Sequence, residues 1–262
     1  TTKLSLRNTD TNMPVKKKTN KAPGQGMTAK QMKRRKPISQ EYMLNIEPLT
    51  DNQKVMWEQW DEGKMIYAYG VAGTGKTFVA LYKALKEVLD DYSPYEKIYI
   101  VRSLVATREI GFLPGDHEDK SSLYQIPYKK MVQSMFEMPD DNAYEMLYDN
   151  LKAQETISFW STSFIRGTTL DNAIVIIDEC QNLNFHELDS IITRVGQDSK
   201  IIFCGDAAQT DLQKISERTG IIDFQRIIQN MEEFSLIEFN IEDIVRSGLV
   251  RSYLINKINL GL

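Results

Sequence analysis

The sequence predicts an α/β fold in which helices cover both faces of a parallel β-sheet, and three observations support this prediction. First, short runs such as residues 98–101 and 173–177 are apolar throughout, as expected of strands buried on both faces. Second, segments with helical spacing alternate with these runs, which is typical of parallel sheets with helical crossovers. Third, several runs end in Gly or Asp, which places polar residues at the carboxyl edge, where ligands bind in open α/β sheets.

The expected elements follow from these patterns in chain order. Thr50-Asp51 is a favourable helix start, and the strand-like run 65–69 ends at Gly70. Helices, recognised by apolar residues at helical spacing, are expected at residues 51–60, 77–89, 122–138, 185–195 and 241–258. Strands are expected at residues 65–69, 97–101, 157–165, 173–177 and 200–204, with a short edge strand at 234–239. The rest of residues 103–156 is expected to be loop and helix.

The composition is that of a globular protein. Of the 262 residues, 42% are hydrophobic and 26% are charged. No apolar run approaches the roughly 20 residues of a membrane span, and the N-terminus lacks an apolar secretory segment. We therefore expect no membrane contact and a cytoplasmic protein, in the host cytoplasm if the chain is viral. Cys180 and Cys204 end apolar runs and are expected to be buried and reduced, while His117 and His186 lack the spacing of zinc ligands.

Basic residues concentrate at the N-terminus. Residues 1–38 contain eleven Lys or Arg residues and one acidic residue, a charge of +10 in a chain of net charge −4, so the remainder carries −14. We place a boundary near Pro37. Residues 1–37 are expected to form a basic arm that is disordered when free, because it cannot bury enough apolar surface, and residues 38–262 the globular domain. The arm is expected to bind phosphates of RNA or DNA. The alternatives are a solvated tail that aids solubility and a tail that packs back on the acidic body.

A phosphate-binding motif follows the first expected strand. The octapeptide Gly70-Val71-Ala72-Gly73-Thr74-Gly75-Lys76-Thr77 fits the pattern G-x-x-x-x-G-K-[ST] at every position. Its glycines let the loop curl until successive backbone N–H groups point inward, and the following helix adds its positive end. Lys76 supplies a charge to the β- and γ-phosphates, and Thr77 offers a hydroxyl to Mg²⁺. The sequence therefore predicts a nucleoside triphosphate site; the alternative is an idle glycine-rich turn.

Two further strand ends carry polar residues that complement this loop. Asp178 and Glu179 follow the run 173–177, where a Walker B strand places one carboxylate that orders the magnesium shell and a second that polarises the attacking water. Gln209 follows the run 200–204 and is expected to sense the γ-phosphate. The alternative for each is a solvated turn. Because Glu179 supplies a base, the predicted chemistry is hydrolysis rather than binding alone.

Taken together and in order, these motifs resemble the PhoH-like ATPase family, P-loop proteins related to the RecA-like core of superfamily 1 helicases. The resemblance covers residues 37–255 and includes residues 70–77, the loop 109–116 with Lys120, residues 166–170, 176–182, 193–196, 205–211 and 243–247. Cys180 departs from the family, where alanine is usual. Some relatives carry a nuclease domain ahead of this region, whereas this chain has the basic arm, so nuclease activity is not expected. The short length and the arm resemble bacteriophage members.

The resemblance implies a RecA-like fold that hydrolyses ATP with Mg²⁺. Gln53 lies where the related helicases place a glutamine that reads adenine; the alternative is an exposed helical Gln. This chemistry also uses a transition-state arginine. Because the chain has room for one core domain, we expect Arg246, or else Arg166 or Arg194, to reach the nucleotide of a neighbouring subunit in a homo-oligomer, which the family suggests is a hexameric ring. The alternative is that these arginines form structural ion pairs.

Three functions remain open on the sequence alone. The one we favour couples ATP hydrolysis to RNA or single-stranded DNA, as in a translocase or helicase. The others are a nucleotide-gated switch or assembly factor that acts on protein partners, and a small-molecule phosphotransferase. Four aromatic residues of the 103–156 region are expected to pack that region, with base stacking as the alternative. They are Tyr124, Tyr128, Phe136 and Tyr144.

Overall fold

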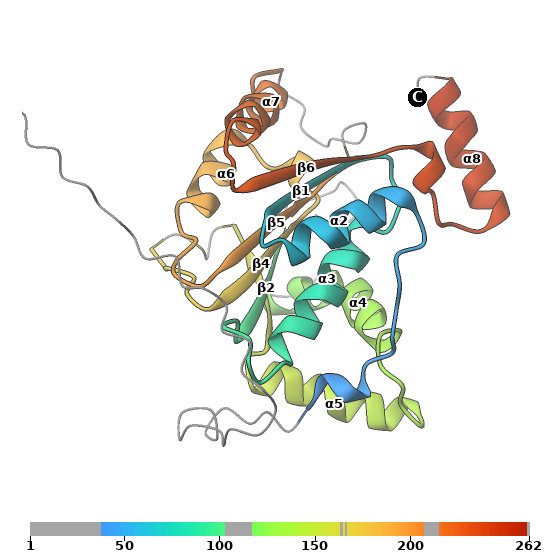
Figure 1. The fold of residues 1–262 in the computed structure, drawn as a ribbon, viewed down its shortest axis with the longest axis vertical. Helices are drawn as coiled ribbons and strands as arrows, with labels where there is room; N and C mark the ends of the chain where they lie inside the picture. The colour runs from blue at the N-terminus through green and yellow to red at the C-terminus, as the bar shows by residue number, and fades with distance from the viewer. Residues whose placement is uncertain (1–37, 103–116, 163–164, 166, 207–214, 261–262) are drawn as a thin grey trace, which may run out of the picture. The chain divides into compact units, whose positions relative to one another are not determined.

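The computed structural model describes residues 38–102, 117–162, 165, 167–206 and 215–260. Within these residues, six strands form one parallel sheet in the order β3-β2-β4-β5-β1-β6 (Figure 1). The strands are β1 (Met65–Gly70), β2 (Lys97–Arg102), β3 (Ile157–Ser161), β4 (Ala173–Asp178), β5 (Lys200–Cys204) and β6 (Phe234–Phe239). The basic arm, the loop at 109–116, Arg166 and Gln209 lie outside the described residues.

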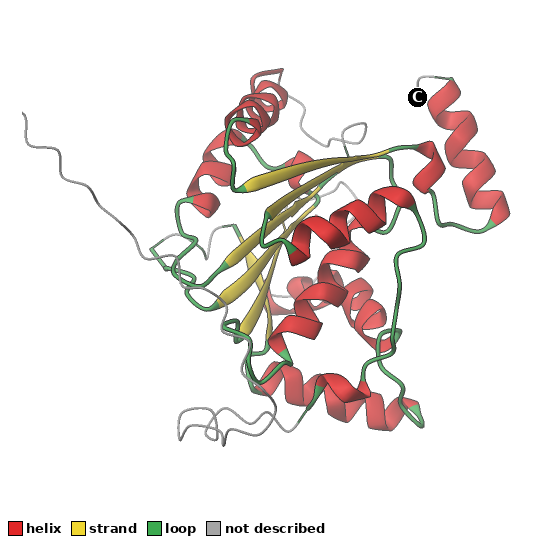
Figure 2. Ribbon diagram, viewed as in Figure 1, coloured by secondary structure: helices red, strands yellow, loops and turns green. Residues whose placement is uncertain are grey.

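Helices lie between most successive strands, because each parallel connection must return to the opposite end of the sheet, although among the described residues β4 follows β3 without a helix (Figure 2). They are α2 (Asp51–Asp61), α3 (Lys76–Val88), α4 (His117–Gln133), α5 (Asp141–Ala153), α6 (Phe185–Ile192), α7 (Ile215–Gln229) and α8 (Gly248–Asn259). Short 3₁₀ turns are η1 (Gln40–Tyr42), η2 (Cys180–Asn182) and η3 (Ile241–Asp243). This architecture confirms the predicted α/β, RecA-like P-loop fold. Within the described residues, every helix is too short or too polar to cross a membrane.

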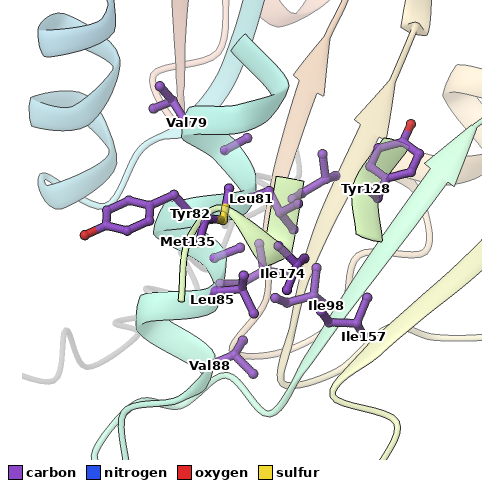
Figure 3. Close-up of a cluster of buried hydrophobic side chains, with 14 of the residues drawn as sticks. Val79, Leu81, Tyr82, Leu85, Val88, Ile98, Tyr128, Met135, Ile157 and Ile174 are labelled. Carbon is purple, nitrogen blue, oxygen red and sulfur yellow. The ribbon is translucent and has the colours of Figure 1, made fainter. Parts of the chain in front are cut away.

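The sheet separates two apolar layers. Successive side chains of a strand point to opposite faces, so Ile98 and Ile100 of β2 join the layer under α2, α3, α4 and α5, whereas Val101 joins the layer under α6 and α7. Figure 3 shows Leu85 of α3 close to Ile98 and Ile174 in the first layer. Fully burying one such aliphatic side chain contributes about 1.5–3 kcal/mol, and together they fix the position of α3 on the sheet.

Buried aromatic and cysteine side chains agree with the sequence prediction. Tyr128, Phe136 and Tyr144 are all buried in the layer under α3, so they pack the 103–156 region as expected. Cys180 and Cys204 are buried and free. Burial, with Asp178 nearby, raises the pKa of the Cys180 thiol to about 12, so this cysteine stays protonated and unreactive at neutral pH.

Two expected helices have different bounds because their backbone groups bind elsewhere. The helix expected at 122–138 is α4, which ends at Gln133, since Met135 O accepts a hydrogen bond from the Leu44 N–H (2.8 Å). The continuous helix expected at 241–258 is wrong. It is split into η3 and α8, because the Val245 N–H donates to Gly73 O (3.1 Å) instead of a helical carbonyl.

Three smaller differences concern two element ends and one additional helix. The strand expected at 157–165 stops at Ser161, and the helix expected at 185–195 stops at Ile192, after which Val195 forms a parallel bridge with Leu170. Helix α7 was not expected from the sequence. None of these differences moves a strand end that carries a predicted site residue.

The buried carboxylate of Asp243 joins the end of the sheet to α2. It accepts hydrogen bonds from Asn52 Nδ2 (2.7 Å) and from the Asn240 N–H (2.9 Å), and it is 2% exposed. Burial opposes its charge, but hydrogen bonds from Asn52 and Thr50 outweigh burial and lower the pKa of Asp243. Its contribution to stability is therefore present above the ordinary aspartate pKa and is lost as the pH falls through the lowered value.

We expect Asp243→Ala to lower the free energy of unfolding by about 1–3 kcal/mol at neutral pH, because it leaves buried donors unpaired. The difference from wild type should shrink in acid, where the native carboxylate is protonated too. Urea unfolding at neutral and acidic pH measures both effects. The exposed neighbour Glu242 supplies the control, since Glu242→Ala should change stability by less than about 0.5 kcal/mol. Equal effects of the two substitutions would contradict this account.

Candidate functional site

The predicted site residues gather at the carboxyl edge of the sheet. Parallel pairing sets Arg102 beside Asp178 at the ends of β2 and β4, and Ala68 of β1 beside Cys204 of β5. A cavity of about 360 Å³ opens over these strand ends. Among its lining residues are Ala72 to Phe78, Arg102, Tyr128, Asp178, Glu179, Asp206 and Arg246. The structure thus brings together most of the residues that the sequence analysis selected.

The phosphate-binding loop depends on glycine at both ends. Gly70 has φ +114°, and a Cβ there would lie 2.1 Å from the Phe239 carbonyl oxygen of the neighbouring strand. Gly75 has φ +82° and precedes the first residue of α3, where its left-handed conformation turns the chain into the helix. The loop therefore curls against β6 and presents the amino end of α3 to the cavity, as an anion site requires.

The Lys76 ammonium lies inside this curl. It donates to Val71 O (2.6 Å), Gly70 O (3.2 Å) and Thr74 Oγ1 (3.2 Å), and the residue is 8% exposed. Burial lowers the pKa of Lys76, while Asp206 and the other nearby acidic groups work in the opposite direction. The loop thus concentrates positive charge at one point, which suits polyphosphate oxygens.

Thr77 and Asp178 are in direct contact although they are far apart in the sequence. Thr77 Oγ1 donates to Asp178 Oδ1 (2.6 Å), and the Tyr128 hydroxyl donates to Asp178 Oδ2 (2.5 Å). With its proton directed at Asp178, Thr77 keeps its oxygen lone pairs for another ligand. One hydroxyl and one carboxylate beside a phosphate loop are a donor set that suits Mg²⁺, which usually keeps several waters and takes its other ligands from phosphate.

Glu179 lies at the mouth of the cavity in a strained backbone conformation. Its φ of 53° and ψ of 41° are left-handed, which costs a non-glycine residue on the order of 1 kcal/mol or more. Gln181 Nε2 donates to Glu179 Oε2 (2.7 Å), and Arg102 Nη2 lies 3.9 Å from Glu179 Oε1. Gln181 Oε1 in turn accepts from the Asp206 N–H (2.9 Å). The strained turn and Gln181 together hold the carboxylate beside Asp178.

A second cavity of about 720 Å³ adjoins the first through Gly73, Gly75 and Arg246, which line both. Residues 45–49, α2, α3 and α4 form its walls, with Trp57, Phe78 and Tyr82 as the aromatic residues. Its volume and mixed lining are in the range of small-molecule sites.

Gln53 lies at the junction of this cavity with the phosphate loop. Its Nε2 donates to Thr74 O (2.8 Å), and its Oε1 accepts from the Leu49 N–H (2.8 Å). Gln53 is 4% exposed, so the alternative of an exposed helical glutamine is wrong. The NH₂ group and the oxygen of the Gln53 side chain each keep one further hydrogen-bonding position, because the NH₂ group has two donors and the oxygen has two lone pairs.

The structure places Arg246 at the P-loop of its own chain. Gly73 packs closely against Arg246, since a Cβ on Gly73 would lie 2.9 Å from Arg246 Cγ. Arg246 also lines both cavities. Arg194 does not line either cavity. Arg166 and Gln209 lie outside the described residues.

Three residues of this site were not selected from the sequence. Arg102 ends a buried strand, so the same rule that selected Asp178 identifies it in hindsight. Gln181 and Tyr128 gave no such signal, because neither ends a strand. Tyr128 was expected to pack the 103–156 region, with base stacking as the alternative, and its contact with Asp178 depends on how α4 lies on the sheet.

Comparison with known proteins identifies relatives over most of the chain. The family model described as PhoH-like protein matches residues 45–256. A PhoH-like protein of Bacillus subtilis is 33% identical over 195 residues, 71% of this chain and 56% of that protein. One from Mycobacterium leprae is 30% identical over 206 residues, 78% of this chain and 56% of that protein. The chain thus spans a little over half the length of these curated relatives.

Solved structures with a similar arrangement are more distant in sequence. The large terminase of a thermophilic bacteriophage is 12% identical, with a TM-score of 0.44 over 79% of this chain and 50% of that chain. The Pif1 helicase of Candida albicans is 17% identical, with a TM-score of 0.41 over 82% of this chain and 44% of that chain.

The lowered pKa of Lys76 predicts an alkaline limit to polyphosphate binding. As the pH rises through the lowered pKa, the ammonium loses its proton and its attraction for phosphate. The affinity for ADP should therefore begin to fall at a pH below 10.5, the ordinary lysine pKa. Titration calorimetry across a pH series measures this change. Lys76→Arg is the matched variant, because arginine keeps its charge and should flatten the alkaline fall. A wild-type affinity that stays constant up to the ordinary lysine value would contradict the prediction.

Proposed function

Because the chain belongs to the PhoH-like protein family, we propose that it is a magnesium-dependent ATPase whose activity is coupled to RNA or single-stranded DNA. One observation carries the proposal: Thr77, Asp178 and Glu179 meet at the mouth of a complete phosphate-binding loop. A site for binding alone needs the loop, whereas the added carboxylate of Glu179 supplies a base for water.

The phosphate groups are assigned to the loop between Gly70 and Thr77. Residues 72–77, which include the start of α3, line the 360 Å³ cavity, and Lys76 is a buried charge among them. The ammonium makes three contacts with the loop, and bound phosphate would replace part of them. The resulting charge-assisted hydrogen bonds are shorter and stronger than those to neutral carbonyls.

The metal is assigned to Thr77 and, through water, to Asp178. The two side chains are hydrogen-bonded to each other, and both line the smaller cavity, so their remaining lone pairs lie close together. When held there by Thr77 and Asp178, Mg²⁺ would neutralise negative charge on the bound phosphates. Within the described residues there is no cluster of three His, Cys, Asp or Glu side chains suited to a metal. A site completed by phosphate and water agrees with that donor set.

Hydrolysis is assigned to Glu179, which orients and deprotonates water at the γ-phosphate. The left-handed turn after β4 sets its direction, and Gln181 fixes one carboxylate oxygen (2.7 Å). Arg102 is close enough to interact with the other oxygen (3.9 Å). Gln209, which lies outside the described residues, keeps its proposed role as γ-phosphate sensor.

The adenine ring and ribose are assigned to the 720 Å³ cavity. Gln53 at its junction with the loop keeps one donor and one acceptor position beyond its bonds to Thr74 and Leu49, which matches the donor and acceptor on the adenine edge. Because the same Gln53 amide donates to Thr74 O, the proposed base-recognition residue also stabilises the conformation of the phosphate loop.

Arg246 is assigned to the nucleotide of its own chain. From the sequence it was expected to reach a neighbouring subunit, but it packs against Gly73 and lines both cavities of its own P-loop. The proposed homo-oligomer, a hexameric ring, therefore does not rest on this arginine. Light scattering with and without nucleotide tests the ring separately.

The matched pair Lys76→Ala and Glu179→Gln separates binding from hydrolysis. We expect Lys76→Ala to weaken ATP binding roughly tenfold to a hundredfold, because it removes a charged hydrogen-bond donor. Glu179→Gln should bind ATP normally and lower turnover by about 10²–10⁴-fold, because the base is lost while its shape remains. Calorimetry and phosphate release measure the two effects, with Lys54→Ala at an exposed position as the control. Normal turnover in both variants would refute the site.

Coupling to nucleic acid predicts stimulation of ATP turnover by RNA or single-stranded DNA. The basis is the +10 charge of residues 1–38, and counterion release makes the stimulation fall steeply with added salt. A chain lacking residues 1–37 should lose the stimulation and keep its basal rate. Polyglutamate is the control, since it offers negative charge without bases. No stimulation by any oligonucleotide would instead favour a nucleotide-gated switch that acts on proteins.

A further inference from the structure

The hydroxyl of Tyr128 is bonded to the carboxylate that the proposed function assigns to the metal. Tyr128 lies in α4, is 1% exposed, and donates to Asp178 Oδ2 (2.5 Å), while Thr77 donates to Oδ1 of the same carboxylate (2.6 Å). The Tyr128 hydroxyl is therefore the donor in its hydrogen bond with Asp178.

Packing determines where this hydroxyl points. The Tyr128 ring lies 5.4 Å from the ring of Phe159 in the edge strand β3, and Figure 3 labels Tyr128 beside the sheet. One turn earlier in α4, Tyr124 lies over the Arg102 guanidinium (5.7 Å). One turn later, Met131 lines both cavities. One face of α4 thus contacts the arginine, the metal carboxylate and the wall of the proposed base site.

The two hydrogen bonds act together on the orientation of Asp178. The last torsion of an aspartate side chain is broad, so one hydrogen bond leaves the carboxylate free to pivot. Bonds to opposite oxygens, from α3 on one side and α4 on the other, fix its plane. Each oxygen keeps a lone pair, and these free lone pairs then point in set directions toward the cavity.

We propose that Tyr128 is a positioning residue that fixes the Asp178 carboxylate for the waters of a nucleotide-bound magnesium ion and thereby sets the affinity for the metal. This inference rests on the proposed function of the site. Partners of metal-binding groups typically account for a factor of about 10–100 in metal affinity, because they hold the group in its binding orientation.

The experiment compares wild type with Tyr128→Phe, which keeps the ring and removes the bond to Asp178. Mn²⁺ is titrated into the protein bound to ADP and followed by electron paramagnetic resonance. We expect the Mn²⁺ dissociation constant to rise about tenfold in Tyr128→Phe. The affinity for ADP in the presence of a chelator should stay within about twofold, because the phosphate loop and Gln53 are unchanged. That second measurement also shows that the variant is folded.

Tyr148→Phe is the matched control. Tyr148 is a buried tyrosine of α5 whose hydroxyl has no hydrogen-bond partner among the described residues, so its removal should leave Mn²⁺ affinity unchanged. An unchanged or tighter Mn²⁺ affinity in Tyr128→Phe would overturn the inference, as would an equal loss in Tyr148→Phe. A purely structural role for Tyr128 would instead weaken metal-free ADP binding, with no separate effect on the metal, and would overturn it too. If wild type binds no Mn²⁺ with ADP, the proposed function itself fails.

Discussion

The hydrogen bond between Thr77 and Asp178 is the contact on which the site depends. It joins residues 101 positions apart across the intervening strand β5, and it links the first turn of α3 to the end of β4. Parallel pairing makes the contact possible, because it brings the carboxyl ends of β1, β4 and β5 to one edge. The apolar layers then hold α3 at the height where its hydroxyl reaches the carboxylate. Phosphate, metal and water are all positioned relative to this pair in the proposed mechanism.

Two constrained backbone positions, Glu179 and Gly70, lie where the proposed chemistry requires them. Glu179 adopts a left-handed conformation that few residues other than glycine accept, and Gly70 passes so close to Phe239 that any side chain would clash. These features oppose stability, and the surroundings offset them: Gln181 bonds to Glu179, and the backbone of β6 pairs with β1 beside Gly70. A fold that relaxed either feature would be easier to form but would direct the carboxylate or the loop amides elsewhere.

Segments from both ends of the described chain complete the candidate nucleotide site. Residues 45–49 and α2 wall the larger cavity, and Val245 and Arg246 return from β6 to contact Gly73. Asp243 joins the two segments through Asn52. This arrangement explains why η3 and α8 are separate: between them the Val245 N–H donates to Gly73 O of the phosphate loop. The proposed base site, the loop and the final strand are therefore parts of one packed unit.

The sequence alone determined the strands, their polar ends and the phosphate loop. Local rules act there: apolar runs report burial on both faces, and the curled loop has few solutions other than Gly70-x-x-x-x-Gly75-Lys76-Thr77. Only the tertiary structure decided that Arg246 lies at its own P-loop, that Gln53 is buried against Thr74, and that Tyr128 reaches Asp178. Those contacts join residues 21 or more positions apart. They depend on how the helices pack against the sheet, and local sequence patterns do not specify that packing.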